Sequence, residues 1–507
     1  MNGIRPQQLD SCKRRIAQRL EESSSEDRGQ PMLNPQNMHY EMAERVRGLA
    51  AGGIGAVHQL ALKIGLVDRI DRALHLLKIH RPYHESDHVL NIAMNVMAGG
   101  ECLEDLELRR NDEVYLDALG TERIPDPTTA GDFCRRFSRA DVYALLGAID
   151  ETRLDVWARQ PDDFFDEAVI DMDGTLVTTT GECKQGMDIS YKGVWGYHPL
   201  LVSLANTGEV LSIVNRSGNR PSYEGAHHEI DRAIQLCERA GFRRILLRGD
   251  TDFTQTKYLD GWDDQGVKFI FGMDVSAGVH IRADDLPRDI WQLLERPPKY
   301  KVATEPRQRP ENVKERIVQL RKFKNIRLQA EWVAEFAYRP VACNKDFRLI
   351  VVCKDLQIEN DPQGVLFEDY RYFLYLTNDW DLPAEQIVLS ANGRCHQENI
   401  IEQGKNGVRC FHAPLDNLMS NWAYMVMTAL AWNLKAWWAL TLPETPRWRE
   451  KHKQEKQLVL RMEFKRFVNS FVQIPCQLIR TGRRLVFRIL AWNRYLPIFR
   501  RLLQALE

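Results

Sequence analysis

The sequence of 507 residues predicts a multidomain α/β protein in which a β-rich insertion interrupts a mixed-sheet core. A helical domain is expected before that core and a basic helical region after it. Three patterns predict this fold class: apolar residues at helical spacing over residues 1–165, short β-branched runs from Glu167 onward, and helical spacing again from Gln397. At about 150 residues per domain, the length allows about three domains.

The N-terminal segment, residues 1–165, is expected to be a helical bundle. Apolar residues recur at helical spacing from Met42 to Leu77, and a further apolar helix is predicted from Val89 to Met97. Glycines are expected to divide the first run into two helices, at Gly52, Gly53 and Gly55.

Residues 166–273 are expected to form the first part of the sheet core. Three strand-like runs, AVIDMDGTLVTT, YHPLLVSLA and EVLSIVN, follow one another too closely for parallel crossovers, so they predict an antiparallel meander. A helix from Tyr223 to Arg239 and two more short strands, RRILLRGD and VKFIFGMD, complete the order β-β-β-α-β-α-β. This order predicts a mixed sheet.

The insertion is expected at residues 274–369, and the second part of the core at residues 370–440. Within the insertion, a helix with a basic outer face is predicted over ENVKERIVQLRKFK, directly before the strictly alternating strand IRLQAEWVAEFAY. Trp332 shares one face of that strand with Ile326 and Phe336, which favours a place in the sheet core.

The C-terminal region, residues 441–507, is expected to be basic and helical. Residues 447–507 hold 15 Lys/Arg and 4 Asp/Glu. Residues 1–446 hold the other 54 Lys/Arg and 66 Asp/Glu, so the net charge of −1 for the whole chain conceals a basic end and an acidic body. This asymmetry indicates a basic C-terminal region that binds a polyanion. The alternative is a solvated amphipathic helix.

Membrane and zinc-ribbon proteins are excluded by two patterns. The apolar stretch from Trp422 to Leu442 is interrupted by Asn433 and Lys435, and a charge in mid-bilayer costs about 3 kcal/mol. The ten cysteines form no Cys-x-x-Cys pair. We therefore expect a buried helix in a cytoplasmic protein.

The first candidate site residues are Asp171 and Asp173, in the run DMDGT. Strand alternation places both on the same face of the predicted strand. Neighbouring carboxylates repel each other unless a divalent cation lies between them. A simple turn at the strand end is the alternative.

Two further motifs supply carboxylates. Asp250 follows the buried run RRILL, at a strand end where open α/β sheets keep their sites, and Asp252 is a weaker candidate. In GRCHQENIIEQGKNG, four charged residues fall on one helical face at offsets of 0, 4, 8 and 11 residues: Arg394, Glu398, Glu402 and Lys405. An exposed face with Arg–Glu pairs is the alternative.

Taken together, these motifs place two Asp on neighbouring strands and one Glu on a later helix. Three such carboxylates would bind two hard divalent cations through oxygen, for chemistry on a phosphodiester.

The ordered motifs DMDGT, GYHPL, SGN, RGDTDF and R-x3-E-x6-K resemble those of the DDE transposases of bacterial insertion sequences. They are most similar to the insertion-sequence family numbered thirteen-eighty, and the resemblance spans about residues 40–440. Arg394, Glu398 and Lys405 match the last three residues of the Tyr–Arg–Glu–Lys signature of the wider superfamily. The Tyr of that signature would fall at position 391, which is Ala391 in this chain.

The resemblance implies a ribonuclease-H-like core and a set of residue roles. Asp173, Asp250 and Glu398 would be the catalytic carboxylates and the ligands of two Mg²⁺ or Mn²⁺ ions, supported by Asp171, Arg394 and Lys405. Asp173 is preferred to Asp171 because the family's first Asp lies two residues before a Thr, here Thr175. DNA contacts are expected from five basic residues, Arg483, Arg484, Lys314, Arg321 and Lys322.

The resemblance also implies cut-and-paste transposition in a bacterial cytoplasm, on nucleoid DNA. A homodimer would cleave double-stranded DNA at terminal inverted repeats and transfer the strands to target DNA. The N-terminal domain and the basic tail would bind the repeats, and the insertion would cover the bound end, where Trp332 would stack on an unpaired base if it is not in the core.

Two other functions fit parts of the sequence. DMDGT also resembles the first motif of the haloacid-dehalogenase phosphatases, in which Asp171 would be the nucleophile. That fold needs a parallel sheet with helical crossovers after its first strand. A catalytically inactive DNA-binding protein would keep the basic surfaces and lose the carboxylates.

Overall fold

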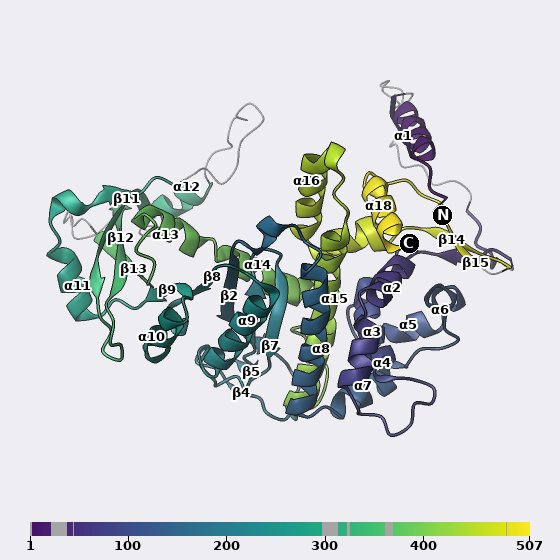
Figure 1. Ribbon diagram of the computed structural model, residues 1–507, viewed down its shortest axis with the longest axis horizontal. Coiled ribbons are helices and arrows are strands. Elements are labelled where there is room, and N and C mark those ends of the chain that lie inside the picture. Colours follow the sequence, from purple (N-terminus) through teal and green to yellow (C-terminus); the bar gives the residue numbers. More distant parts are fainter. Residues whose placement is uncertain are drawn as a thin grey trace.

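The computed structural model describes residues 3–21, 38–43, 45–296, 313–321, 325–359, 369–482 and 484–507. Figure 1 shows an elongated molecule with the large sheet toward one end and both chain termini at the other. The long helices α8 (Arg139–Trp157) and α15 (Leu418–Thr441) lie between these two parts.

Helices make up most of the N-terminal segment, as the helical spacing predicts. Their bounds are α1 (Pro6–Glu21), α2 (Ile54–Lys63), α3 (Leu66–Ala73), α4 (Glu85–Met97), α5 (Leu106–Arg110), α6 (Glu113–Leu119) and α7 (Pro127–Arg135), and the short strand β1 (Gly48–Leu49) precedes α2.

The break expected at Gly52, Gly53 and Gly55 is confirmed in part: α2 begins directly after Gly53, but the short strand β1 precedes it where a helix was expected. A further break, between α2 and α3, lies at Gly65, which has a φ of 72°. The first glycines also allow the chain to approach the C-terminal region: the Gly53 amide donates to the Val472 carbonyl at 2.9 Å, and a Cβ on Gly53 would lie 1.9 Å from the Phe471 carbonyl oxygen. Side chains at these positions would separate the two ends of the chain.

Within the described residues, one mixed sheet of nine strands runs in the order β10-β11-β12-β13-β9-β8-β2-β6-β7. In its core half, β2 pairs antiparallel with β6, β6 pairs antiparallel with β7, and β8 and β9 extend the other side in parallel. The predicted meander and β-β-β-α-β-α-β order are confirmed for β2 (Ala168–Gly174), β6 (Leu200–Leu204), β7 (Glu209–Val214), α9 (Ala226–Ala240), β8 (Ile245–Gly249), α10 (Thr256–Asp264) and β9 (Lys268–Met273). Three short strands between β2 and β6 form a small sheet of their own, β3 (Val177–Thr178), β4 (Asp188–Ile189) and β5 (Trp195–Tyr197).

The strands of the expected insertion continue the core sheet. β13 pairs antiparallel with β9, with Leu374 opposite Met273, so the described part of the insertion has no separate sheet. The elements are α11 (Ala277–Asp284), β10 (Gln292–Leu293), α12 (Val313–Leu320), β11 (Asn325–Tyr338), β12 (Phe347–Glu359) and β13 (Asp369–Thr377).

Trp332 on β11 is not a core residue, which corrects the expectation from its alternating face. Its side chain is 37% exposed, whereas Val333 is buried in a cluster with Ile387 and Val388 of α13 (Ala384–Asn392). The helix α13 therefore covers the other face of β11.

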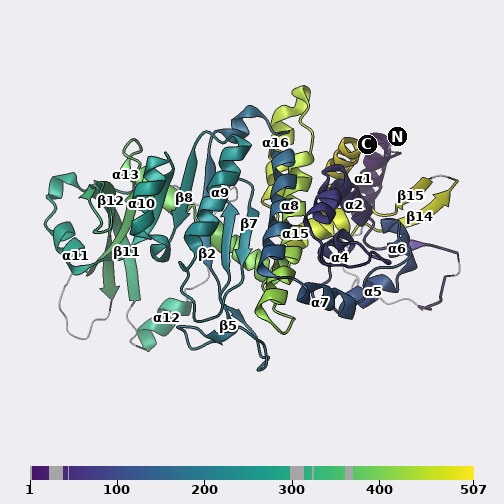
Figure 2. The same ribbon diagram turned by 60° about the horizontal axis from the view of Figure 1, so that its bottom comes forward.

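The apolar stretch after Trp422 forms the buried helix that was expected. Residues Ser420 to Leu440 of α15 are all buried, and no helix in the described part of the chain is long and apolar enough to cross a membrane. Asn433, which interrupts the apolar run, pairs with the outermost strand β7: its amide nitrogen donates to the Val210 carbonyl at 3.0 Å, and its oxygen accepts from the Val210 amide at 2.9 Å. The helix α15 thereby supplies hydrogen-bond partners for backbone groups of β7, the strand at the edge of the sheet (Figure 2).

The expectation of a wholly helical C-terminal region is wrong for residues 476–481 and 484–489. These residues form a hairpin of β14 (Cys476–Thr481) and β15 (Arg484–Ile489), and β14 pairs with β1. Along β15 the burial of the side chains alternates, and the chain before it turns at Gly482 with a φ of 47°. The rest of the region is helical, in α16 (Arg449–Leu460), α17 (Phe464–Phe467) and α18 (Leu496–Leu506).

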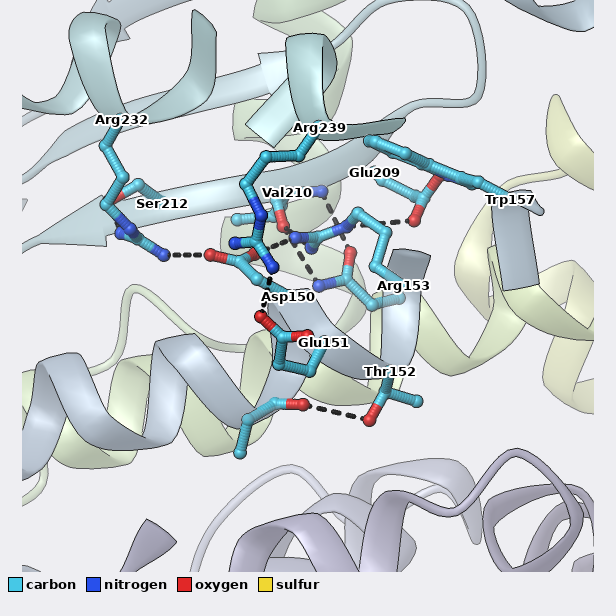
Figure 3. A network of polar contacts seen from close by, with 12 residues as sticks. Asp150, Glu151, Thr152, Arg153, Trp157, Glu209, Val210, Ser212, Arg232 and Arg239 are labelled. Atoms are coloured by element: carbon cyan, nitrogen blue, oxygen red, sulfur yellow. Dashed lines mark hydrogen bonds and ion pairs between the residues drawn. The ribbon is translucent and has the colours of Figure 1, made fainter. Parts of the chain in front are cut away.

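A buried ionic network fixes α8 and α9 to the sheet (Figure 3). Arg153 of α8 is fully buried and donates to the Glu209 carboxylate at 3.1 Å and to the Val210 carbonyl at 2.6 Å. Asp150, one turn earlier, pairs with both Arg153 and Arg232 of α9. Because every charge here has an opposite partner, the network can stay buried.

Candidate active site

Two carboxylates lie together at the carboxyl ends of two neighbouring strands in the middle of the sheet. Asp173 is the next-to-last residue of β2, and Asp250 directly follows β8. These two strands are parallel neighbours in a register that pairs Asp171 with Arg248, so Asp173 and Asp250 occupy equivalent positions two residues later. The carboxyl end of parallel strands is where open α/β sheets place their sites.

Arg394 lies between the two carboxylates. Its NH1 nitrogen is 3.6 Å from Oδ2 of Asp173 and 3.7 Å from Oδ2 of Asp250. Arg394 is the N-cap residue directly before α14 (Cys395–Glu402), and Gln397 fixes that helix to the sheet by donating to the Leu201 carbonyl of β6 at 3.1 Å. The sheet and α14 together therefore bring the three motifs DMDGT, RGDTDF and R-x3-E into one site.

The protonation of the two carboxylates reflects their surroundings. Burial and the neighbouring charge of Asp250 raise the pKa of Asp173 to about 6, against the opposing effect of Arg394. Burial also raises the pKa of Asp250, and Arg394 again opposes this shift. Desolvation and like-charge repulsion of this kind are typical of a site that holds a cation.

Glu398 and Lys405 lie on the same side as the carboxylate pair. The charge of Glu398 contributes to the raised pKa of Asp173, and the charge of Asp173 partly offsets the burial that lowers the pKa of Lys405. Glu398 is exposed and forms no hydrogen bond or ion pair with the described residues. Glu402 differs, because it accepts hydrogen bonds from Gln403 at 3.0 Å and Asn406 at 3.3 Å.

The single straight helix expected for Arg394 to Lys405 is wrong. The α-helix ends at Glu402, and a π-helical turn over Gln403–Gly407 follows it. A Cβ on Gly404 would lie 2.5 Å from the Phe411 ring, so a glycine lets this turn pack closely. Such wide turns are frequent at functional sites, and this one sets the position of Lys405.

Asp171 does not share the open site. It is fully buried, and both of its carboxylate oxygens accept from Arg248, each at 2.7 Å. Arg248 also donates to the Ser390 carbonyl at 2.8 Å, which ties β8 to α13. The expected support from Asp171 is therefore structural.

The phosphatase alternative does not fit this arrangement. Its nucleophile, Asp171, is buried and paired, and the strand that pairs with β2 next along the chain, β6, is antiparallel to it.

Arg216, which the sequence interpretation did not select, shapes the wall beside Asp173. It lies in the motif RSGN, and its guanidinium donates to the carbonyls of His198 at 3.0 Å, Ser222 at 2.9 Å and Glu224 at 2.8 Å. A Cβ on Gly174 would lie 2.8 Å from Nε2 of His198. The motifs GYHPL and RSGN contain His198 and Arg216, so their order along the chain could have pointed to both residues. The hydrogen bonds of Arg216 to backbone carbonyls could not be predicted from the spacing of the motifs.

Tyr375 is a second residue that the motifs did not point to. It lies on β13 and packs against the apolar cluster that contains Ala391. Arg296 and Arg394 lower its pKa, although burial raises it overall. The Tyr of the signature is replaced by Ala391 in this chain, but the aromatic side chain of Tyr375 lies near Arg394.

The basic residues expected to contact DNA do not form one surface. Lys314 and Arg321 are exposed at α12, and Arg484 is exposed on β15. Figure 1 shows α12 and β15 at opposite ends of the molecule. Lys322 and Arg483 lie outside the described residues.

The donor set at the carboxylate pair fits a divalent cation. Among the residues that the structure describes, no three His, Cys, Asp or Glu side chains are grouped as a metal site. Asp173 and Asp250, however, offer oxygen ligands on adjacent strands, and their repulsion is relieved here by one guanidinium. Hard cations such as Mg²⁺ bind such carboxylates.

Comparison with known proteins identifies the family. The family model described as "Transposase DDE domain group 1" matches residues 49–507. No curated protein matches the chain. A solved structure titled "Cryo-EM structure of piggyBac transposase synaptic complex with hairpin DNA (SNHP)" aligns with 11% identity and a TM-score of 0.32, over 82% of this chain and 87% of that chain.

The family match includes the carboxylate pair, α14 and the whole C-terminal region. DDE transposases are enzymes that cut DNA and transfer its strands during transposition, and the family uses divalent metal ions. Because its sequence matches the family model from residue 49 to residue 507, the chain belongs to the DDE transposases.

Proposed function

We propose that the protein is a cut-and-paste transposase that cleaves DNA at terminal inverted repeats and transfers the freed strands to a target. The observation that carries this proposal is the convergence of Asp173, Asp250 and Arg394 at the carboxyl ends of β2 and β8. Carboxylates and a guanidinium on one sheet edge can bind both a cation and a phosphodiester.

Asp173, Asp250 and Glu398 are the proposed catalytic carboxylates. Asp173 and Asp250 are partly shielded from solvent and close enough to repel each other. Glu398 has no competing partner among the described residues, and its charge acts on Asp173. These features support a third ligand that joins the pair when the site is filled.

Two Mg²⁺ or Mn²⁺ ions would be held by these three carboxylates. When bound, such ions activate a water or a 3′-hydroxyl and stabilise the leaving oxygen of the phosphodiester. Arg394 and Lys405 present positive charge beside the same carboxylates, where they would orient the DNA phosphates.

The core is proposed to be ribonuclease-H-like. Three antiparallel strands followed by two parallel ones, in the order β7-β6-β2-β8-β9, support this assignment. The motifs from DMDGT to R-x3-E-x6-K favour the bacterial insertion-sequence family numbered thirteen-eighty.

The proposed setting is the bacterial cytoplasm, on nucleoid DNA. A homodimer would pair two transposon ends. The helical domain at residues 1–165 and the basic region at residues 441–507 would bind those ends, and residues 274–369 would lie over the cleaved end.

The test is strand cleavage of a duplex that carries the inverted repeats flanking the gene. We expect nicking that needs Mg²⁺ or Mn²⁺ and stops with EDTA, and we expect Asp173→Asn to abolish nicking while end binding is retained. Hydrolysis of a generic phosphomonoester with no nicking would contradict the proposal. Binding without nicking in any metal would indicate the inactive DNA-binding protein.

A further inference from the structure

The hairpin of β14 and β15 has one packed face and one open face. In its register, Gln477 faces Arg488, Ile479 faces Val486, and Thr481 faces Arg484. Side chains of such cross-strand pairs lie on the same side of the ribbon. Arg484 and Arg488 are exposed, and Val486 between them is 41% exposed. The open face therefore alternates cation, apolar group and cation along β15.

The opposite face holds the hairpin on the body of the protein. Cys476 and Leu478 are buried, and a Cβ on Gly55 of α2 would lie 2.7 Å from the ring of Phe487. Arg480 also points to the body, since it forms an ion pair with Asp117 of α6 at 3.1 Å. The ribbon is thus fixed in place while its cations on the other face stay open.

We propose that the open face of this ribbon enters a groove of double-stranded DNA and reads base pairs. A two-stranded β-ribbon is one of the two elements that the major groove admits. Arginine is the usual partner of guanine there, glutamine pairs with adenine, and apolar side chains contact the thymine methyl. One face of the ribbon offers all three kinds of contact: arginines at Arg484 and Arg488, a glutamine at Gln477 and an apolar side chain at Val486.

The spacing of the ribbon suits a duplex. Residues two apart on a strand are separated by about 6.8 Å, which is about two base-pair steps. Arg484 and Arg488 would therefore address base pairs about four steps apart. The Gln477 oxygen accepts from the Arg488 guanidinium at 3.3 Å, so the two polar groups at one end are already aligned.

Charge favours DNA as the occupant of this face. Residues 447–507, which include the hairpin, hold 15 Lys/Arg and 4 Asp/Glu. The hairpin also lies on the other side of the long helices α8 and α15 from β2 and β8, whose ends hold the carboxylate pair (Figure 1). A duplex bound there would be read at a distance from the cleaved bond, in the interior of the transposon end. This inference rests on the proposed function for the identity of that end.

The experiment is selection of bound duplexes from a randomised library by the full-length protein in EDTA, followed by sequencing. We expect the wild-type protein to select a defined motif. Arg488→Ala and Arg484→Ala should each lose preference at their own base pairs, by about 5- to 150-fold in relative affinity. Arg447→Ala is the matched control, because it removes an exposed arginine of the same basic region outside the hairpin. It should leave the selected motif unchanged.

Two results would overturn the proposal: a wild-type protein that selects no motif, or hairpin variants that select the wild-type motif unchanged. Metal-dependent nicking is measured separately. Ribbon-dependent selection without nicking would refute the proposed function alone, whereas nicking by a protein whose variants keep every base preference would refute the ribbon alone.

Discussion

Asp171 and Arg248 form a two-point ion pair between the parallel strands β2 and β8, with both nitrogen–oxygen distances at 2.7 Å. Both side chains are buried. Replacing Asp171 by Asn leaves the guanidinium without its counter-charge, and breaking a buried pair in this way costs about 3–5 kcal/mol. We expect Asp171→Asn to lower the free energy of unfolding by that amount, measured by urea denaturation.

Asp173→Asn is the control for this prediction. Asp173 carries no such pair and is repelled by Asp250, so its neutralisation should leave stability unchanged or raise it. A stable Asp171→Asn protein that had lost its activity would reverse the roles assigned to the two aspartates.

Glu398 is predicted to be essential for strand cleavage. It is exposed and has no partner among the described residues, so Glu398→Gln should fold and bind transposon ends as the wild-type protein does. The loss of one carboxylate should abolish nicking in a plasmid cleavage assay.

Glu402→Gln provides the matched comparison, one turn along the same segment. Glu402 accepts hydrogen bonds from Gln403 and Asn406, away from the carboxylate pair, so nicking should persist. Cleavage that depended on Glu402 and tolerated Glu398→Gln would show that the signature is assigned to the wrong glutamate.

Arg394 is predicted to compete with a cation for the carboxylate pair. Its NH1 nitrogen lies within 3.7 Å of both Asp173 and Asp250. A fixed positive charge at this distance opposes the binding of another. Without DNA, Arg394→Gln should therefore bind Mn²⁺ more tightly than the wild-type protein, by about tenfold, as measured by electron paramagnetic resonance. Weaker binding would mean that Arg394 organises the ligands instead.

Gly404 is predicted to set the position of Lys405. A Cβ at this residue would lie 2.5 Å from the Phe411 ring, so Gly404→Ala should displace the π-helical turn and cost about 1–3 kcal/mol of stability. Nicking should fall more than end binding does. Phe411→Leu in the same chain should restore part of the nicking rate. If the double variant shows no recovery, the contact between Gly404 and Phe411 does not set the position of Lys405.

The strands and the carboxylates were predictable because both follow local rules. Alternation at period two reveals β11 whatever covers it, and Asp173 and Asp250 lie at the ends of short apolar runs that form β2 and β8. The same alternation cannot say which face another element covers. For that reason Trp332 was expected in the core: α13 covers the side of Val333, and the face of Trp332 is covered only farther along, where Ala334 is buried and Phe336 packs against the main hydrophobic cluster.

Other features depend on contacts that a single sequence does not contain. Asp171 and Asp173 share a strand face, and only the register with Arg248 separates the paired residue from the open one. The arginines at 484 and 488 fit helical spacing as well as strand spacing, so the hairpin became visible only through its pairing with β1. The π-helical turn, likewise, follows from the fit of Gly404 against Phe411.

Lys435 is predicted to make stability depend on pH. It is buried in α15, where its ammonium donates to the Leu460 carbonyl at 2.8 Å, and burial lowers its pKa to about 7. In the unfolded chain its pKa returns to about 10.4. Between these two values the unfolded state binds one more proton than the folded state, so the free energy of unfolding rises with pH, by up to about 1.4 kcal/mol per pH unit. Lys435→Met removes this contribution, so its advantage over the wild-type protein should be largest below about pH 7 and shrink toward about pH 10. Urea denaturation of both proteins across this range measures the difference, and parallel pH profiles would show that Lys435 keeps its charge in the folded protein.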